Sequence, residues 1–137
     1  MALDFRVVHP SIDPGVAAKK LGLKLNRSWK VGEVKTTPKG LVLGGKRKES
    51  YGSFTLEDSS ASGPADLIAR WNGRLERHSR FFRRLCRTGG TAEYYVTWYT
   101  GNRASAGDVF DRSLLLATAR IGLGISLEVL PWWGPRA

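Results

Sequence analysis

The chain has 137 residues, of which 42% are hydrophobic and five are tryptophan, and this is enough apolar surface for the core of one domain. Its formal net charge is +10 at pH 7, which favours an anionic partner. No apolar run approaches the roughly 18 residues of a membrane-spanning helix, and the first residues do not resemble a signal peptide. We therefore expect a single soluble domain, 1–137, located in the cytoplasm and without membrane contacts.

The first predicted elements are a strand over 5–9 and a short helix over 14–21. Asp13 is a good N-cap, and Pro14 suits the first helical position. Gly22 is expected to end this helix.

A weaker strand is expected over 25–34, and a clearer one over 50–56. Between them, residues 35–49 form a basic, turn-rich segment that we interpret as a loop able to move.

The segment from Ala65 to Arg87 carries seven arginines against two acids, Asp66 and Glu76. Apolar or ring side chains recur in it at three- and four-residue steps, which predicts one helix with its inner face in the core; these are Leu67, Trp71, Leu75, His78, Phe82 and Leu85. The arginines expected to face water, on either side of this stripe, are Arg70, Arg77, Arg80, Arg84 and Arg87.

Thr91 to Tyr99 alternates as a strand does, with Tyr94, Val96 and Trp98 on one face. A third helix, capped by Asp108 or Asp111, is expected to end near residue 121, and a last strand covers 125–130. This order predicts an α+β fold, with a mostly antiparallel sheet of about five strands covered by helices on one face. Its arrangement would be ferredoxin-like, a split β-α-β with an added C-terminal helix and strand.

Cysteine and histidine are scarce. The single cysteine, Cys86, cannot form an internal disulfide, and its place beside Leu85 predicts a buried thiol in a reducing compartment. The two histidines, His9 and His78, provide no zinc-ligand spacing and are expected to make structural hydrogen bonds. No nucleophile or acid-base pair can be assigned either, so we expect no metal, no cofactor and no enzymatic activity.

Residues 40–46 have the glycine and lysine spacing of a phosphate-binding loop, but Arg47 stands where a Ser or Thr should hold magnesium. The lysines and arginine here could be simply solvated, or the segment could fold onto an anionic surface.

Two aromatic features also leave alternatives open. Tyr95 and Tyr99, on the second face of their strand, could stack nucleic-acid bases or could simply be partly exposed. Trp132 and Trp133 could close the end of the sheet or form a homodimer contact.

Short motifs are spread along nearly the whole chain. They are His9-Pro10-x-Ile12-Asp13-Pro14, Leu21-Gly22-Leu23, Trp29-x-x-Gly32-Glu33, Glu49-Ser50-Tyr51, Ile121-Gly122-Leu123 and Ser126-Leu127-Glu128-Val129. Together they resemble a family of small bacterial proteins, the domain-of-unknown-function family four-two-seven-nine. The resemblance implies a stand-alone α+β domain, and similar small domains often serve as immunity or inhibitor proteins. It carries no catalytic residue.

The function that we expect is therefore non-enzymatic binding of an acidic protein surface, as by an inhibitor or immunity protein. The alternative is a nucleic-acid-binding protein that contacts phosphates through the same helix and the lysine-rich segment. The predicted partner-binding residues are Arg70, Arg77, Arg80, Arg84, Arg87, Lys39, Lys46, Arg47 and Lys48.

Overall fold

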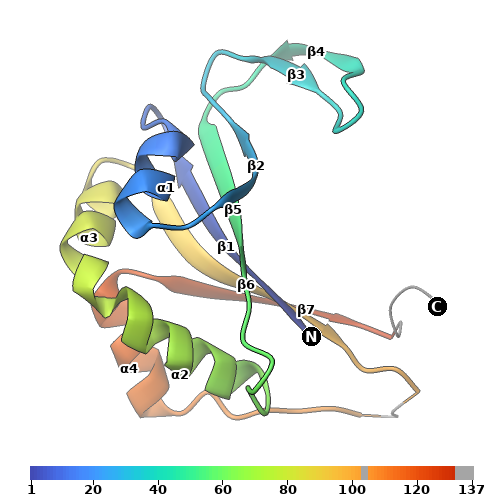
Figure 1. Cartoon of the computed structure of the whole chain (residues 1–137), viewed down its shortest axis with the longest axis vertical. Helices are drawn as coiled ribbons and strands as arrows, with labels where there is room; N and C mark the ends of the chain where they lie inside the picture. Colours follow the sequence, from blue (N-terminus) through green and yellow to red (C-terminus); the bar gives the residue numbers. More distant parts are fainter. Residues whose placement is uncertain (103–104, 132–137) are drawn as a thin grey trace.

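A computed structural model describes residues 1–102 and 105–131. The elements, in chain order, are β1 (Ala2–His9), α1 (Pro14–Leu21), β2 (Leu25–Trp29), β3 (Val34–Thr36), β4 (Val42–Lys46), β5 (Ser50–Leu56), α2 (Pro64–Leu75), the short 3₁₀ helix η1 (Glu76–His78), α3 (Ser79–Arg87), β6 (Thr91–Tyr99), α4 (Arg112–Ile121) and β7 (Gly124–Leu130). The helices lie on one face of a five-stranded sheet, and β3 and β4 form a separate hairpin beyond the sheet (Figure 1).

The strand order of the main sheet is β2-β5-β1-β6-β7. β1 is central and pairs antiparallel with β5 and β6, β2 pairs antiparallel with β5, and β7 pairs parallel with β6. The predicted α+β fold, with a mostly antiparallel sheet and helices on one side, is confirmed. β5 lies between β1 and β2, the two strands that α1 connects, and α4 and β7 form the additional C-terminal helix and strand. The ferredoxin-like classification stays a prediction.

Local sequence signals explain the first helix well. The Asp13 carboxylate accepts a hydrogen bond from Gly15 N at 2.9 Å, and Gly22 ends α1 with a φ of 66°. The helix packs closely on β5 at Gly52. A Cβ atom added at this glycine would lie only 2.8 Å from the Cβ of Pro14. The expected N-cap and helix end are confirmed.

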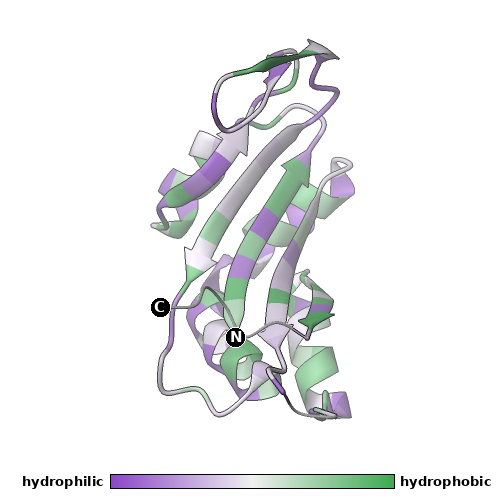
Figure 2. Ribbon diagram, turned by 90° about the vertical axis from the view of Figure 1, so that its right-hand side faces the viewer, coloured by the Kyte–Doolittle hydropathy of each residue, from purple (hydrophilic) through white to green (hydrophobic). Residues whose placement is uncertain are grey.

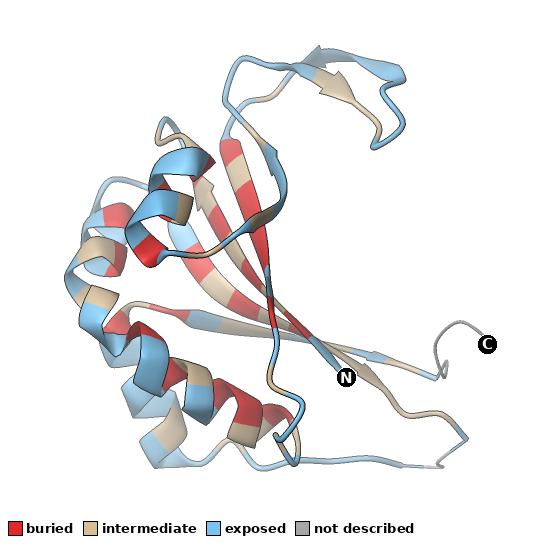
Figure 3. Ribbon diagram, viewed as in Figure 1, coloured by how far each residue is buried: buried red, intermediate tan, exposed pale blue. Residues whose placement is uncertain are grey.

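The core fills the space between the helices and one face of the sheet (Figure 3). Phe5 of β1 is at the centre of the core. The centroid of its ring lies 6.0 Å from that of Phe54, 5.5 Å from that of Phe82 and 5.8 Å from that of Tyr94. Along β1, buried residues alternate with half-buried ones, of which Asp4 and Arg6 are charged. The alternation of hydropathy is visible as alternating colours on the central strand (Figure 2). The sheet therefore has one face in the core and a second, more polar face without a helix on it.

A buried polar chain joins three elements within this core. The Tyr94 hydroxyl donates to Asn72 Oδ1 at 2.9 Å, and Asn72 Nδ2 donates to Thr118 Oγ1 at 2.9 Å. Asn72, Tyr94 and Thr118 are each at most 5% exposed. Because unpaired buried polar groups are costly, this chain fixes how α2 and α4 lie on β6.

The prediction of one continuous helix from Ala65 to Arg87 is wrong. α2 ends at Leu75, η1 adds a turn of 3₁₀ helix, and α3 begins at Ser79. A 3₁₀ turn advances about 120° per residue instead of about 100°, so the side chains of α3 are rotated relative to those of a straight α-helix.

Residues 35–49 do not form an irregular loop throughout. β3 and β4 pair antiparallel, and Thr37 N donates to Leu41 O at 2.8 Å across the turn. The predicted strand over 25–34 is correspondingly shorter and ends at Trp29. β4 runs on into β5, a strand, whereas a phosphate-binding loop leads into a helix.

Two side chains are more exposed than the sequence predicted. Cys86 is exposed on α3, with Sγ 3.6 Å from Gly122 O, so the expectation of a buried thiol is wrong. Trp71 is only partly buried against the core, with the Arg74 guanidinium 4.6 Å from its ring centroid.

Trp132 and Trp133 lie outside the described residues. Within the described ranges, no helix is long and apolar enough to cross a membrane.

Candidate anion-binding face

Two of the seven arginines of the 65–87 segment are held by carboxylates. Arg70 lies 3.1 Å from Asp66 Oδ2 and 3.5 Å from Asp58 Oδ1, and Arg74 lies 2.8 Å from Asp58 Oδ2. The side chain of Asp58 is only 8% exposed. Hydrogen bonds from Ser60, together with the neighbouring arginines, hold the pKa of Asp58 below its usual range. Arg70 is therefore largely engaged inside the molecule, which weakens its prediction as a partner-binding residue.

The arginines of α3 are in a different situation. Within residues 1–102 and 105–131, the guanidinium groups of Arg80, Arg84 and Arg87 have no hydrogen-bond or ion-pair partner. At positions i, i+4 and i+7 they share one side of α3, with successive Cα atoms about 4.5 to 6 Å apart along its axis. They form a row of unpaired, exposed cations.

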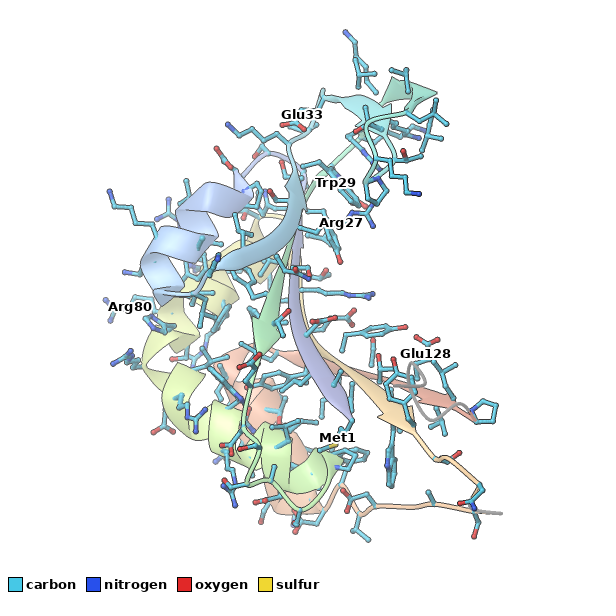
Figure 4. All side chains as sticks on the ribbon, turned by 45° about the vertical axis from the view of Figure 1, so that its right-hand side comes forward. Met1, Arg27, Trp29, Glu33, Arg80 and Glu128 are labelled. Atoms are coloured by element: carbon cyan, nitrogen blue, oxygen red, sulfur yellow. The ribbon has the colours of Figure 1, made fainter. Side chains whose placement is uncertain are left out.

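Other cations lie next to this row. A surface hollow of about 610 Å³ is lined by Lys20, Glu76, Arg77, His78, Ser79, Arg80, Phe81 and Arg84. Lys20 comes from the end of α1 and so reaches this hollow only through the tertiary fold. We call Lys20, Arg77, Arg80, Arg84 and Arg87 the basic face. Figure 4 shows Arg80 on the outer side of the helices, next to the end of α1.

His78 lines the hollow, and its pKa is affected by the positive charges around it. Partial burial and then the positive charges of Arg77 and Lys20 lower its pKa below the ordinary value of 6.5. Its Nε2 accepts a hydrogen bond from Arg77 Nε at 3.3 Å. Because His78 is expected to be neutral at pH 7, the charge of the hollow comes from its lysine and arginines, offset only by Glu76.

The backbone under the basic face is well anchored. Phe82 and Leu85 of α3 are completely buried. On the side of α3 near α4, Arg83 donates to the Arg120 carbonyl from Nε at 3.2 Å and from Nη2 at 3.1 Å. At the other end, His9 Nε2 lies 2.7 Å from Thr88 Oγ1. These contacts fix the spacing of the cations on the helix.

The predicted cations of the 35–49 segment lie elsewhere. Arg47 is engaged, since its guanidinium lies 3.8 Å from the ring centroid of Trp29 and donates to Thr36 O at 3.3 Å. Lys39, Lys46 and Lys48 are exposed and without ion-pair partners in the part of the chain that the structure describes. Their hairpin stands away from the helices, and Trp29 at its base points to the side of the sheet opposite Arg80 (Figure 4). The structure does not bring the two predicted groups of basic residues together.

The helix-free face of the sheet offers little free aromatic surface. The Arg6 guanidinium lies 3.5 Å from the ring centroid of Tyr95, whose hydroxyl donates to Glu128. Trp29 and Tyr51 stack on each other at 4.4 Å. Because these ring faces are already covered, base stacking on Tyr95 would require Arg6 to move.

The described residues contain no cluster of three or more His, Cys, Asp or Glu side chains that could hold a metal ion. His9 makes the structural hydrogen bonds expected of it, because its Nδ1 accepts from Ser11 N and Ile12 N, both at 2.9 Å. The arrangement that remains for function is the basic face. Sequence reasoning missed Lys20, since no local signal relates the end of α1 to α3.

No family model matches the chain, and neither a curated protein nor a solved structure is significantly similar to it. The resemblance to the domain-of-unknown-function family four-two-seven-nine therefore stays a prediction.

Proposed function

We propose that this protein is a non-enzymatic binding protein that engages an acidic surface of another protein through its basic face, as an inhibitor or immunity protein does. One observation carries the proposal: among the residues that the structure describes, the cations of α3 have no acidic partner, whereas Arg70 and Arg74 are paired with Asp58. Unpaired guanidinium groups at fixed spacing are suited to bidentate contacts with carboxylates.

The anchoring of α3 supports this function energetically. Binding costs free energy when side chains and loops must be ordered, and a helix fixed by Phe82 and Leu85 needs little further ordering. Truncating one partner of a buried charge pair at such interfaces typically costs about 2–5 kcal/mol. A few arginines can thus account for most of the affinity.

The positions of the two basic groups favour a protein partner over a nucleic acid. The nucleic-acid alternative uses α3 together with the hairpin lysines, yet α3 lies on one face of the main sheet, whereas the β3–β4 hairpin lies beyond the end of that sheet (Figure 1). A nucleic acid that contacted both would have to extend over these two separate regions. An acidic protein needs only the compact area of the basic face.

The test compares two variants that each remove three cations. Replacing Arg77, Arg80 and Arg84 together by Ser should abolish partner capture, because the centre of the basic face is lost. The control replaces Lys39, Lys46 and Lys48 by Ser, which changes the net charge equally but only on the hairpin. Capture is measured by pull-down from a lysate of the native host with and without nuclease treatment, followed by affinity measurement with the captured protein.

We expect the control to bind like the wild type, and all three proteins to have nearly the same thermal midpoint. Replacing Arg80 and Arg84 by Lys should also weaken binding, because Lys cannot make bidentate contacts. Binding that survives the first substitution would refute the proposed role of the basic face. Nuclease-sensitive capture, with a steep salt dependence and loss in the hairpin control, would instead establish the nucleic-acid alternative.

A further inference from the structure

β7 is an edge strand with a free outer side within residues 1–102 and 105–131. It pairs only with β6, in a regular register from Gly124 to Leu130. The Leu130 carbonyl accepts from Thr100 N at 2.9 Å, so the backbone polar groups of Leu130 point toward β6. Because these groups alternate in direction along a strand, those of Ile125, Leu127 and Val129 point outward.

The side chains of β7 give this edge no protection against pairing. Leu127 is 43% exposed and Val129 is 52% exposed, although both are apolar. Glu128 carries the only charge of the strand, and it faces the helix-free side of the sheet, where Tyr95 donates to it. Long, apolar edges of this kind pair readily with a further strand.

The opposite edge of the sheet differs in these respects. β2 has a register shift between Leu25 and Arg27, and it exposes the polar residues Asn26, Arg27 and Ser28. Bulges and charged side chains are the usual means by which proteins protect an edge strand. The contrast marks β7 as the edge that is left open for a partner.

We propose that β7 pairs antiparallel with β7 of a second copy of this chain, about a two-fold axis at Leu127, to form a sheet that is continuous across both copies. In this register, each outward N–H and C=O group of Ile125, Leu127 and Val129 meets its complement in the partner. Leu127 lies opposite the partner's Leu127, and Ile125 lies opposite the partner's Val129. Apolar side chains therefore face one another across the interface.

The same register suits the other face of the strand. Ser126, whose hydroxyl donates to Glu93 of its own chain, lies opposite the partner's Glu128, so that no two carboxylates of β7 are directly opposed. A register centred on Glu128 would oppose two carboxylates, which is destabilising. A register centred on Ser126 would place Val129 beyond the end of the partner strand, which begins at Gly124. The sequence of β7 is thus self-complementary about Leu127, as an isologous two-fold interface requires.

The experiment uses sedimentation velocity of the full chain over a range of concentrations. We expect the wild type to be a dimer. Leu127→Lys and Leu127→Glu should each weaken self-association by roughly tenfold or more, because like charges then meet on the axis. Since Leu127 is partly exposed in the single chain, circular dichroism should show both variants folded. The control, Val42→Lys, changes an exposed strand residue of the hairpin and should leave the dimer intact.

Mixing the two charge variants provides the decisive measurement. Leu127→Lys and Leu127→Glu should form a heterodimer with each other, because an ammonium group then lies opposite a carboxylate. A monomeric wild type, a dimer that persists in both charge variants, or failure of the mixture to associate would each overturn the proposed pairing.

Discussion

His9 connects three parts of the chain through one imidazole ring. Its Nδ1 accepts two backbone N–H groups that precede α1, and its Nε2–H donates to Thr88 at the end of α3. The residue is 3% exposed. The ring must be neutral to make these bonds, since protonation of Nδ1 would remove an acceptor from two donors.

The pH dependence of stability should reflect this ring. Burial lowers the pKa of His9 below 6.5, so the unfolded chain binds the proton more strongly than the folded one. The contribution of His9 is therefore complete above about pH 6.5 and is lost as the pH falls below that value. We expect the free energy of unfolding, measured with urea, to fall between about pH 7 and pH 5.

His9→Asn should reduce the slope of the free energy of unfolding against pH in this range, because an Asn side chain can keep the local acceptor but does not titrate. His78→Gln serves as a comparison, since the pKa of His78 is lowered as well and its own part of the slope should disappear. Acidic groups such as Asp58 and Asp66, whose pKa values are lowered, change charge only in more acidic solution. An unchanged slope in His9→Asn would show that the ring is not the titrating group.

Among the elements, the β3–β4 hairpin is the one most separable from the domain. Leu41, Val42 and Leu43 are more than half exposed, so their removal takes nothing from the core. At the base of the hairpin, Arg47 N donates to Glu33 O at 2.7 Å, which means that residues 33 and 47 are already neighbours. A two-residue Asn-Gly turn fits such a junction.

Replacing residues 34–46 with Asn-Gly should therefore leave the thermal midpoint within a few degrees of the wild-type value. Binding of the acidic partner should persist as well, because the basic face is untouched. Thermal unfolding and the pull-down assay check the two outcomes. Unfolding of the shortened chain would mean that residues 34–46 stabilise the sheet although they lie outside its core.

Helices and strands were predictable from the sequence where the residues that define them are close together along the chain. The cap at Asp13, the helix end at Gly22 and the alternation of 91–99 are encoded within a few residues, and all three were predictable. The turn of 3₁₀ helix at Glu76–His78 contains neither Gly nor Pro, so no sequence signal indicates the break. That break rotates α3 by about 60°, so the side chains of α3 do not continue the faces of α2 as they would in one long helix.

The candidate site was predictable only in part for a related reason. The sequence indicates an arginine-rich helix, but it does not indicate which arginines are neutralised. Asp58 reaches Arg70 and Arg74 because the loop before α2 folds back on that helix. Long-range approaches of this kind, like that of Lys20 to α3, depend on the whole tertiary fold.

For the whole molecule, the net charge of +10 should give the two proposed interfaces opposite responses to salt. Two copies repel one another, and salt screens that repulsion over a Debye length of about 10 Å at 0.1 M. Raising NaCl from about 0.05 M to 0.5 M should thus strengthen the β7–β7 dimer and weaken the complex with an acidic protein. Sedimentation and affinity measurements across this range test both; dimerisation that weakens with salt would contradict a pairing held by backbone and apolar contacts.

The central place of β1 in the sheet also matters during synthesis. β1 leaves the ribosome before the other strands of its sheet, yet its two neighbours are β5 and β6, so its second edge stays open until residue 99 has emerged. Throughout that interval, the nascent chain carries an apolar stripe whose core is not yet complete; the stripe is formed by Leu3, Phe5 and Val7. The interval between the synthesis of β1 and that of β6 is therefore the period in which a chaperone that holds extended apolar segments would protect this sheet most.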